Sequence, residues 1–331
     1  MEPKSRILIV GATGYIGKYI ATASIQSGHP TSILVRPQVS KHVDKVRFLV
    51  GLRKAGATIY TCFLEDREDL VRILQQVDVV ICALGEDQLK LQYDLIRAVK
   101  EAGNIKKFYP SEFGMDADRI CKDQSIPESP MYRDKVAIRR AIEAAGIPHT
   151  FFMANCIMGL MLASFVQMDG FPTFTPPRDK VCIYKDGDHK VMYISEEDLA
   201  TYLLKSVDDP RTLNKALYVR PPGNALTMNE QVALWEEMTG STLEKRWMSE
   251  EEVLLHINGE SFHLRGLLTG LFGFADAQTP LQLREVWTRI YHVFYNGAMC
   301  FELAPDDIEA TALYPEVEYT SPQVYLKPYV C

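Results

Sequence analysis

The chain has 331 residues, 47% of them hydrophobic and 24% charged, with a formal net charge of −7 at pH 7. This composition is ordinary for a soluble globular protein with a sizeable core, and the negative charge argues against nucleic acid or an anionic membrane as partner. No run of about 18 uninterrupted apolar residues is present, and the N-terminus leads straight into an apolar run rather than a signal peptide, so we expect a cytoplasmic protein. The seven cysteines include no CxxC pair, which favours reduced core thiols and no metal site.

Up to residue 154, short apolar runs alternate with amphipathic segments. Strands separated by helices predict parallel βαβ units with right-handed crossovers, and therefore an α/β, doubly wound Rossmann-type sheet. The expected strands are residues 6–10, 31–35, 58–62, 77–83, 107–109 and 150–153. The expected helices are residues 15–27, 45–55, 67–76, 88–102 and 133–145.

Beyond Asn155 the alternation loosens. We expect strands at 180–184 and 191–194, helices at 229–239 and 249–257, and a loop at 171–177. Residues 259–283 are apolar and rich in glycine. They fit a helical lid over an apolar pocket and a pair of core helices equally well.

A glycine-rich turn joins the first expected strand to the first expected helix. It holds Gly11, Gly14 and Gly17, the spacing that accommodates a dinucleotide pyrophosphate. The first glycine permits a tight turn, the second allows close approach of the backbone, and the third lets the helix pack on the strand. The free N–H groups and positive dipole end of the helix attract the anion. We therefore expect a dinucleotide cofactor here rather than a purely structural turn.

The end of the second expected strand distinguishes NAD from NADP. An acidic residue there would bind the ribose 2′-hydroxyl, but this chain has Arg36, which can pair with a 2′-phosphate. Lys41 and Lys45 follow; a solvated helix face is the simpler interpretation of both, although Lys45 is kept as a candidate. We expect an NADPH-binding Rossmann domain over 1–154 and a smaller α/β substrate-binding lobe over 155–331, some of whose segments return to the sheet.

Lys135 is the candidate catalytic residue. Short-chain dehydrogenases place a Tyr-x-x-x-Lys pair in this part of the fold, on one helix face. Here Met131 stands four residues before Lys135, and Tyr132, expected just before the helix, stands three before it. The standard pair is absent, so Lys135 works without that tyrosine or is a surface lysine.

Several motifs together closely resemble the plant isoflavone reductase-like family, which belongs to the atypical, NmrA-like short-chain dehydrogenases. They are Ile-Val-Gly-Ala-Thr-Gly-Tyr-Ile-Gly-Lys at 9–18, Pro-Ser-Glu-Phe-Gly at 110–114, Lys135 followed by Ile-Arg-Arg-Ala-Ile-Glu at 138–143, Asp-Asp-Pro-Arg-Thr-Leu-Asn-Lys at 208–215, and Asn224 with Trp235 and Glu236. The family includes pinoresinol–lariciresinol, phenylcoumaran benzylic ether, isoflavone and leucoanthocyanidin reductases, and eugenol synthases. The resemblance covers nearly the whole chain and is weakest at 259–290.

The resemblance implies NADPH as hydride donor and Lys135 as the catalytic lysine. In the family's scheme a base removes a phenolic proton, the para benzylic carbon–oxygen bond breaks to give a quinone methide, and hydride adds to the benzylic carbon. Burial and nearby cations would suit a lysine to the base role by lowering its pKa. Holding the nicotinamide ribose is the alternative role.

The site residues expected from the turn and the resemblance fall into two groups. The cofactor group is Gly11, Thr13, Gly14, Tyr15, Ile16, Gly17, Arg36, Lys45, Ala83, Leu84, Gly85, Ser111, Glu112, Phe113, Lys135, Asn155 and Ile157. The substrate group is Met115, Met158 and Met161. Two positions depart from the family pattern: Ile157 replaces a frequent phenylalanine, and Leu84-Gly85-Glu86 replaces Val-Gly-Gly.

The expected substrate is a small phenolic molecule. Met115 resembles the lignan reductases, where leucoanthocyanidin reductases carry a histidine, whereas residues 131–135 and Ile157 resemble the leucoanthocyanidin type. We favour a lignan or benzylic-ether reductase over a leucoanthocyanidin or isoflavone reductase. A reductase of an unusual specialised metabolite and an NADP-binding redox sensor without turnover stay open, as does a homodimer. A structural or surface role is the simpler interpretation of His149, His189, His256, His263 and His292, and contact of one of the last three with the substrate stays open.

Overall fold

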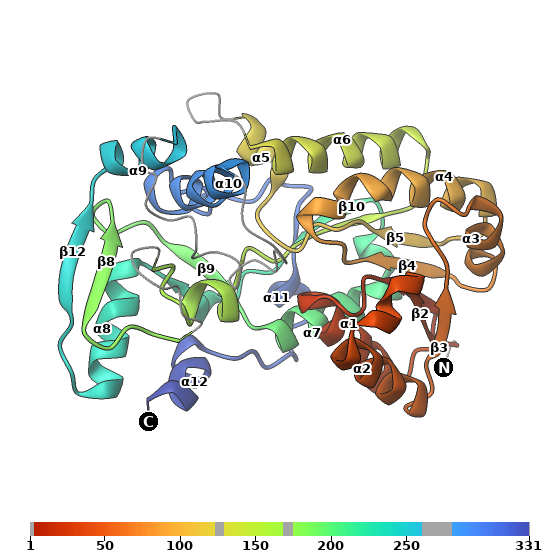
Figure 1. Ribbon diagram of the computed structural model, residues 1–331, viewed down its shortest axis with the longest axis horizontal. Helices are drawn as coiled ribbons and strands as arrows, with labels where there is room; N and C mark the ends of the chain where they lie inside the picture. Colours follow the sequence, from red (N-terminus) through yellow and green to blue (C-terminus); the bar gives the residue numbers. More distant parts are fainter. Residues whose placement is uncertain (1–2, 123–128, 168–174, 260–279, 331) are drawn as a thin grey trace.

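The computed structural model describes residues 3–122, 129–167, 175–259 and 280–330. Its centre is a parallel sheet of five strands in the order β3-β2-β1-β4-β5 (Figure 1). These strands are β1 (Ile7–Val10), β2 (Thr31–Val35), β3 (Thr58–Thr61), β4 (Val79–Cys82) and β5 (Lys107–Tyr109). β1 and β4 are buried along their whole length, as continuous apolar runs predict for a sheet covered on both faces.

Later segments of the chain continue this sheet. Strand β6 (Thr150–Met153) is joined to β5 by a parallel bridge between Phe108 and His149. β6 pairs in parallel with β10 (Lys215–Tyr218), which pairs with the short β13 (Ile308–Glu309). Residues from the second half of the chain therefore lie beside strands of the first half.

Helices cover both faces of the sheet (Figure 1). On one face are α1 (Tyr15–Gln26), α2 (Val43–Lys54) and α7 (Glu196–Val207), and on the other are α3 (Arg67–Leu74), α4 (Gln92–Ala102) and α6 (Pro130–Ala144). Ile20, Leu49 and Leu203 belong to one buried cluster of the first face, and Leu70 and Leu95 to the cluster of the second. This is the expected doubly wound α/β architecture.

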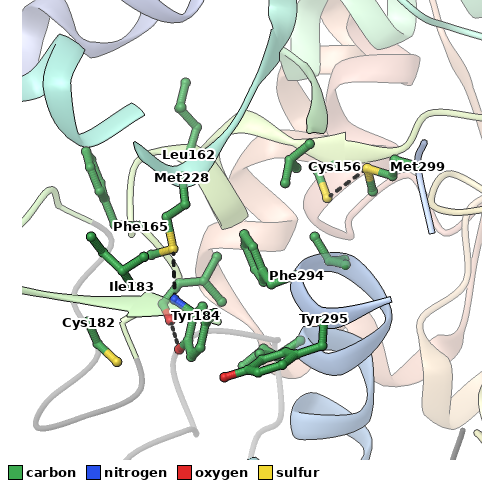
Figure 2. Packing of buried hydrophobic residues seen from close by; sticks show 14 of the residues in the cluster. Cys156, Leu162, Phe165, Cys182, Ile183, Tyr184, Met228, Phe294, Tyr295 and Met299 are labelled. Atoms are coloured by element: carbon green, nitrogen blue, oxygen red, sulfur yellow. Dashed lines mark hydrogen bonds between the residues drawn. The ribbon is translucent and has the colours of Figure 1, made fainter. Parts of the chain in front are cut away.

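The remaining elements form a third core beside the sheet. They are β7 (Cys156–Ile157), β8 (Lys180–Tyr184), β9 (Val191–Ile194), β11 (Ala225–Leu226), β12 (Glu244–Met248), α5 (Ala117–Lys122), α8 (Met228–Thr239), α9 (Glu250–Ile257), α10 (Pro280–Ile290), α12 (Pro322–Leu326) and π-helical turns at Met158–Leu162 and Tyr291–Tyr295. The short helix α11 (Ala310–Leu313) instead packs in the buried cluster on the first face of the sheet. Figure 2 shows part of this core, where the Sγ of Cys156 faces the Sδ of Met299 at 3.9 Å. Four cysteines, Cys62, Cys82, Cys156 and Cys182, are buried. Within the described ranges, no helix is long and apolar enough to span a membrane.

The structure corrects some expected boundaries. Helix α6 begins at Pro130, so Tyr132 lies inside the helix rather than before it. The reason is local: the Ser129 side chain caps the helix by accepting from the Tyr132 N–H at 3.3 Å, and Pro130 suits the first helical position. Residues 88–91, expected to be the start of an α-helix, belong instead to a 3-10 helix, Glu86–Leu91, that precedes α4. Most of the segment 259–283, for which a lid and a pair of core helices were both expected, lies outside the described ranges. Residues 171–174 of the expected loop also lie outside them.

Candidate active site

The candidate residues gather where the parallel strands end. The glycine turn follows β1, Arg36 follows β2, Ala83 follows β4 and Ser111 follows β5. Asn155 comes two residues after the end of β6. The carboxyl ends of parallel strands share one edge of a sheet, and ligands of doubly wound folds bind at that edge. The neighbouring substrate candidates Met158 and Met161 lie in the π-helical turn that follows β7.

The turn after β1 is closed so tightly that side chains are sterically excluded. Gly11 has φ +89°, in the left-handed region, and a Cβ there would lie closer than 3.0 Å to the carbonyl group of Ala83. A Cβ on Gly17 would lie closer than 3.0 Å to the carbonyl group of Gly11. Gly14 caps α1, and its N–H donates to the Gly11 carbonyl at 2.9 Å. The turn therefore leaves bare backbone at the N-terminus of a 12-residue helix, the arrangement that binds a pyrophosphate.

Arg36 stands exposed at the end of β2. Its guanidinium has no hydrogen-bond or ion-pair partner within the described residues, so it is available to an anion. Lys45 is also exposed, on α2, and no hydrogen bond or ion pair joins it to the rest of the candidate site in the described ranges. The structure thus brings Arg36 to the expected edge and leaves Lys45 on a solvated helix face.

The loops after β4 and β5 are tied together through Ser111. Its hydroxyl donates to the Leu84 carbonyl at 2.6 Å, and its N–H donates to the Gln92 side chain at 2.8 Å. Gly11 packs against Ala83, the residue before Leu84. Three segments of the candidate cofactor site are therefore in direct contact with one another.

Lys135 points from α6 toward the loop after β5. Its ammonium donates to the Glu112 carbonyl at 2.7 Å, and only 8% of the residue is exposed. The Glu112 side chain is bound by Arg139, one helical turn after Lys135, through two hydrogen bonds of 2.7 and 2.9 Å. Arg139 also donates to Asp116 at 2.6 Å. A buried ion pair between Glu112 and Arg139 thus joins the two family motifs at 110–114 and 138–143.

The surroundings of Lys135 favour its neutral form. Burial lowers the pKa of the ammonium from its ordinary value, and the cations Arg139 and Arg289 act in the same direction, while Glu112 and Glu86 oppose them. A buried lysine with a lowered pKa is a common feature of acid–base sites.

Tyr132 shares a helix face with Lys135 and is buried. Its ring meets the edge of His292 with centroids 6.0 Å apart, and burial raises the pKa of its hydroxyl. His256 is stacked on Trp287 at 4.1 Å, and His263 lies outside the described residues.

The residues expected around the nicotinamide and the substrate occupy defined places. Asn155 has φ +57°; its backbone N–H donates to the Gly114 carbonyl at 3.1 Å, and its side-chain amide donates to the Val219 carbonyl at 2.8 Å. Phe113 also has a positive φ, +41°. Ile157 is buried in β7. The methionines Met115, Met158 and Met161 pack in the third core.

Two polar pairs at this edge were not anticipated from the sequence. Glu86, one of the residues that depart from the family pattern, forms an ion pair of 2.9 Å with Arg289 of α10. Glu196, at the start of α7, accepts from the Tyr15 hydroxyl. The partners are far apart along the chain, so local patterns carry no signal for either pair; only the Ser195 cap followed by acidic residues marks α7 itself.

The model of the NmrA-like family matches residues 3–326. The chain belongs to this family. It is 43% identical to bifunctional pinoresinol-lariciresinol reductase 1 of Thuja plicata, with 100% of both chains covered, and 43% identical to eugenol synthase 1 of Petunia hybrida, with 98% of this chain and 99% of that protein covered. The solved structure of AtPrR2 with NADP+ and (+)pinoresinol has a TM-score of 0.87 and 36% identity, covering 99% of this chain and 100% of that one.

These relatives confirm the expected family, the isoflavone reductase-like plant reductases of the NmrA-like group. Its close relatives are NADPH-dependent reductases, and solved members hold NADP+ or NADPH. Two relatives of equal identity carry the names of different activities, so overall identity leaves the substrate open.

Proposed function

We propose that this chain is an NADPH-dependent reductase that delivers hydride to a benzylic carbon of a phenylpropanoid-derived phenol. The observation that carries the proposal is Lys135, which is buried at the carboxyl edge of the sheet with a lowered pKa. A basic group enclosed at the sheet edge that also carries a dinucleotide-binding turn suits a reaction that starts by removing a phenolic proton.

The chain's own groups fit the cofactor. The closed turn at Gly11, Gly14 and Gly17 would hold the pyrophosphate on the backbone N–H groups of α1, and Arg36 would pair with the 2′-phosphate. The loops joined through Ser111 would border the nicotinamide half, with Asn155 beside it. When bound, NADPH supplies the hydride.

Lys135 would take the phenolic proton of the substrate at its Nζ. The neutral amine is needed for that step, and burial beside Arg139 and Arg289 favours it. Once the phenolate forms, electrons move through the ring and the para benzylic carbon–oxygen bond breaks. The resulting quinone methide accepts hydride at the benzylic carbon and becomes a phenolate again. The phenolate regains its proton from the Lys135 ammonium, and the released oxygen takes up a proton from solvent and becomes a hydroxyl group. The alternative role, in which Lys135 only holds the nicotinamide ribose, would leave the proton to another base.

Within this class we favour a lignan or benzylic-ether substrate. Met115, where leucoanthocyanidin reductases are expected to carry a histidine, is buried among the apolar residues of the third core and supplies no proton donor. A leucoanthocyanidin or isoflavone substrate is the second candidate, favoured by residues 131–135 and Ile157. An NADP-binding sensor without turnover has no evident use for a buried basic Lys135.

Incubation with NADPH and a panel of phenols tests this function. The panel holds pinoresinol, lariciresinol, dehydrodiconiferyl alcohol, an isoflavone and leucocyanidin, and the readouts are loss of NADPH absorbance and product mass. We expect turnover of pinoresinol, lariciresinol or dehydrodiconiferyl alcohol. Tight NADPH binding without NADPH consumption in the presence of any of these phenols would contradict the reductase proposal and favour the redox sensor.

A further inference from the structure

A buried carboxylate joins the cofactor turn to two other parts of the chain. Glu196, the first residue of α7, is only 1% exposed. Its Oε1 accepts from the Tyr15 hydroxyl and from the Gly159 N–H at 3.1 Å, and its Oε2 accepts from the Tyr325 hydroxyl at 3.0 Å. Both oxygens are therefore used, and all three donors are neutral groups.

These donors come from three separate places. Tyr15 follows Gly14 and is the first residue of α1, where the pyrophosphate is expected. Gly159 lies between the substrate candidates Met158 and Met161, and Tyr325 lies on α12 near the C-terminus. One carboxylate thus touches the cofactor side, the substrate side and the C-terminal helix.

The junction is closely packed. A Cβ on Gly159 would lie closer than 3.0 Å to Glu196 Oε1 and to the hydroxyls of Tyr15 and Tyr325. Burial, together with Glu196, raises the pKa of both tyrosines, so each hydroxyl stays a donor. A second carboxylate of α7, Asp198, accepts from the Thr320 N–H at 2.7 Å and fixes the segment that leads to Tyr325.

From this geometry we infer that Glu196 is a positioning residue. It fixes the cofactor turn relative to the Met158–Leu162 segment, and through Tyr325 it couples the position of α12 to the position of Tyr15. The inference rests on the proposed NADPH-binding function. Charge-assisted hydrogen bonds of buried groups are strong enough to preorganise a turn, and a preorganised turn binds its ligand more tightly.

Calorimetric titration of the full chain with NADP+ tests this role without knowledge of the substrate. Glu196→Gln keeps the side-chain volume but loses the charge and one acceptor, so we expect the NADP+ Kd to rise about tenfold. Glu197→Gln is the matched control, because Glu197 is the exposed neighbour on the same helix, and we expect its Kd to be unchanged.

Tyr325→Phe separates positioning from general stability. Although Tyr325 lies on α12, Tyr325→Phe should weaken NADP+ binding about threefold, because it acts through Glu196. The same substitution should have no further effect on NADP+ binding when Glu196→Gln is already present. Thermal unfolding identifies any variant that fails to fold. If Glu196→Gln does not fold, the NADP+ affinity of Tyr325→Phe alone tests the inference. Unchanged Kd in a folded Glu196→Gln, or a Tyr325→Phe effect that adds fully to it, overturns this inference alone. Absence of NADP+ binding by the unaltered chain overturns the proposed function and this inference together.

Discussion

The Nζ of Lys135 donates to the backbone carbonyl of Glu112 at 2.7 Å, while the Glu112 side chain is held by Arg139. Glu112, in the loop after β5, therefore holds the Lys135 amine through its backbone carbonyl. Its side chain is held in turn by Arg139, one turn further along α6. The amine sits in a rigid frame and is removed from water, the two conditions that suit a base.

Replacing Lys135 tests its role in chemistry. We expect Lys135→Met to lower kcat by about 10²–10⁴-fold, because a positioned acid–base group contributes that much, while NADP+ affinity changes little. Steady-state kinetics and calorimetry give the two quantities. A variant that keeps full kcat would assign the proton to another group, and parallel losses of kcat and cofactor affinity would indicate the ribose-holding role.

The lowered pKa of Lys135 predicts a specific pH dependence. The amine must be neutral to accept a proton, so kcat/KM should rise with pH through an apparent pKa below the ordinary lysine value of 10.5. Lys135→Arg, which stays protonated, should lose this limb. In unfolding experiments the sign follows from proton counting: the unfolded chain binds more protons between the lowered pKa and 10.5, so stability should rise with pH there relative to Lys135→Met.

Arg36 should determine the preference for the phosphorylated cofactor. Removing the guanidinium in Arg36→Ala costs one charge-assisted contact, about 1.5–3 kcal/mol, or roughly 10–150-fold in NADPH affinity. NADH lacks the 2′-phosphate and serves as control, with little change expected. Equal losses for both cofactors would show that Arg36 supports the fold of the turn and not the phosphate.

Gly17 and Gly51 offer a matched pair for the tight turn. A Cβ on Gly17 would meet the backbone of Gly11, whereas one on Gly51 would meet nothing within 4 Å. We expect Gly17→Ala to lower the free energy of unfolding by about 1–3 kcal/mol and Gly51→Ala, in exposed α2, to raise it by up to about 1 kcal/mol. Urea unfolding measures both. Equal effects of the two substitutions would argue against a closed turn.

The ion network beneath Lys135 should be costly to break. Arg139→Met leaves Glu112 buried without its cation and Asp116 with Arg119 alone, so we expect a loss of about 3–5 kcal/mol in the free energy of unfolding. Arg140→Met, on the exposed side of the same helix, is the control, with a loss below about 1 kcal/mol. Similar losses for both would mean that water screens the inner network.

The strands were the most predictable part of the fold. β2, β5, β6, β8 and β9 begin and end where the apolar runs predict, because a strand buried on both faces needs a continuous apolar stretch bounded by polar residues. The start of α6 was missed because its cap is Ser129, ahead of the amphipathic pattern. Helix α7 was missed although Ser195 and the acidic residues after it form an N-terminal signal.

The candidate site divides in the same way. The glycine turn and Arg36 are local in sequence, so their positions follow from the strands they terminate. The pairs between Glu86 and Arg289 and between Tyr15 and Glu196 join residues far apart in the chain, and only the packing of α10 and α7 brings them together. Nothing in the local sequence indicates that these side chains are paired.

The decisive measurement is the transfer of deuterium from NADPH labelled at the nicotinamide C4 position to a phenol of the panel, with the label located by mass spectrometry and NMR. Because Lys135 and the glycine turn are assigned to benzylic reduction, we predict one deuterium at the benzylic carbon of the product. Product with the label at another carbon, or tight NADPH binding with no labelled product from any phenol, would contradict that assignment.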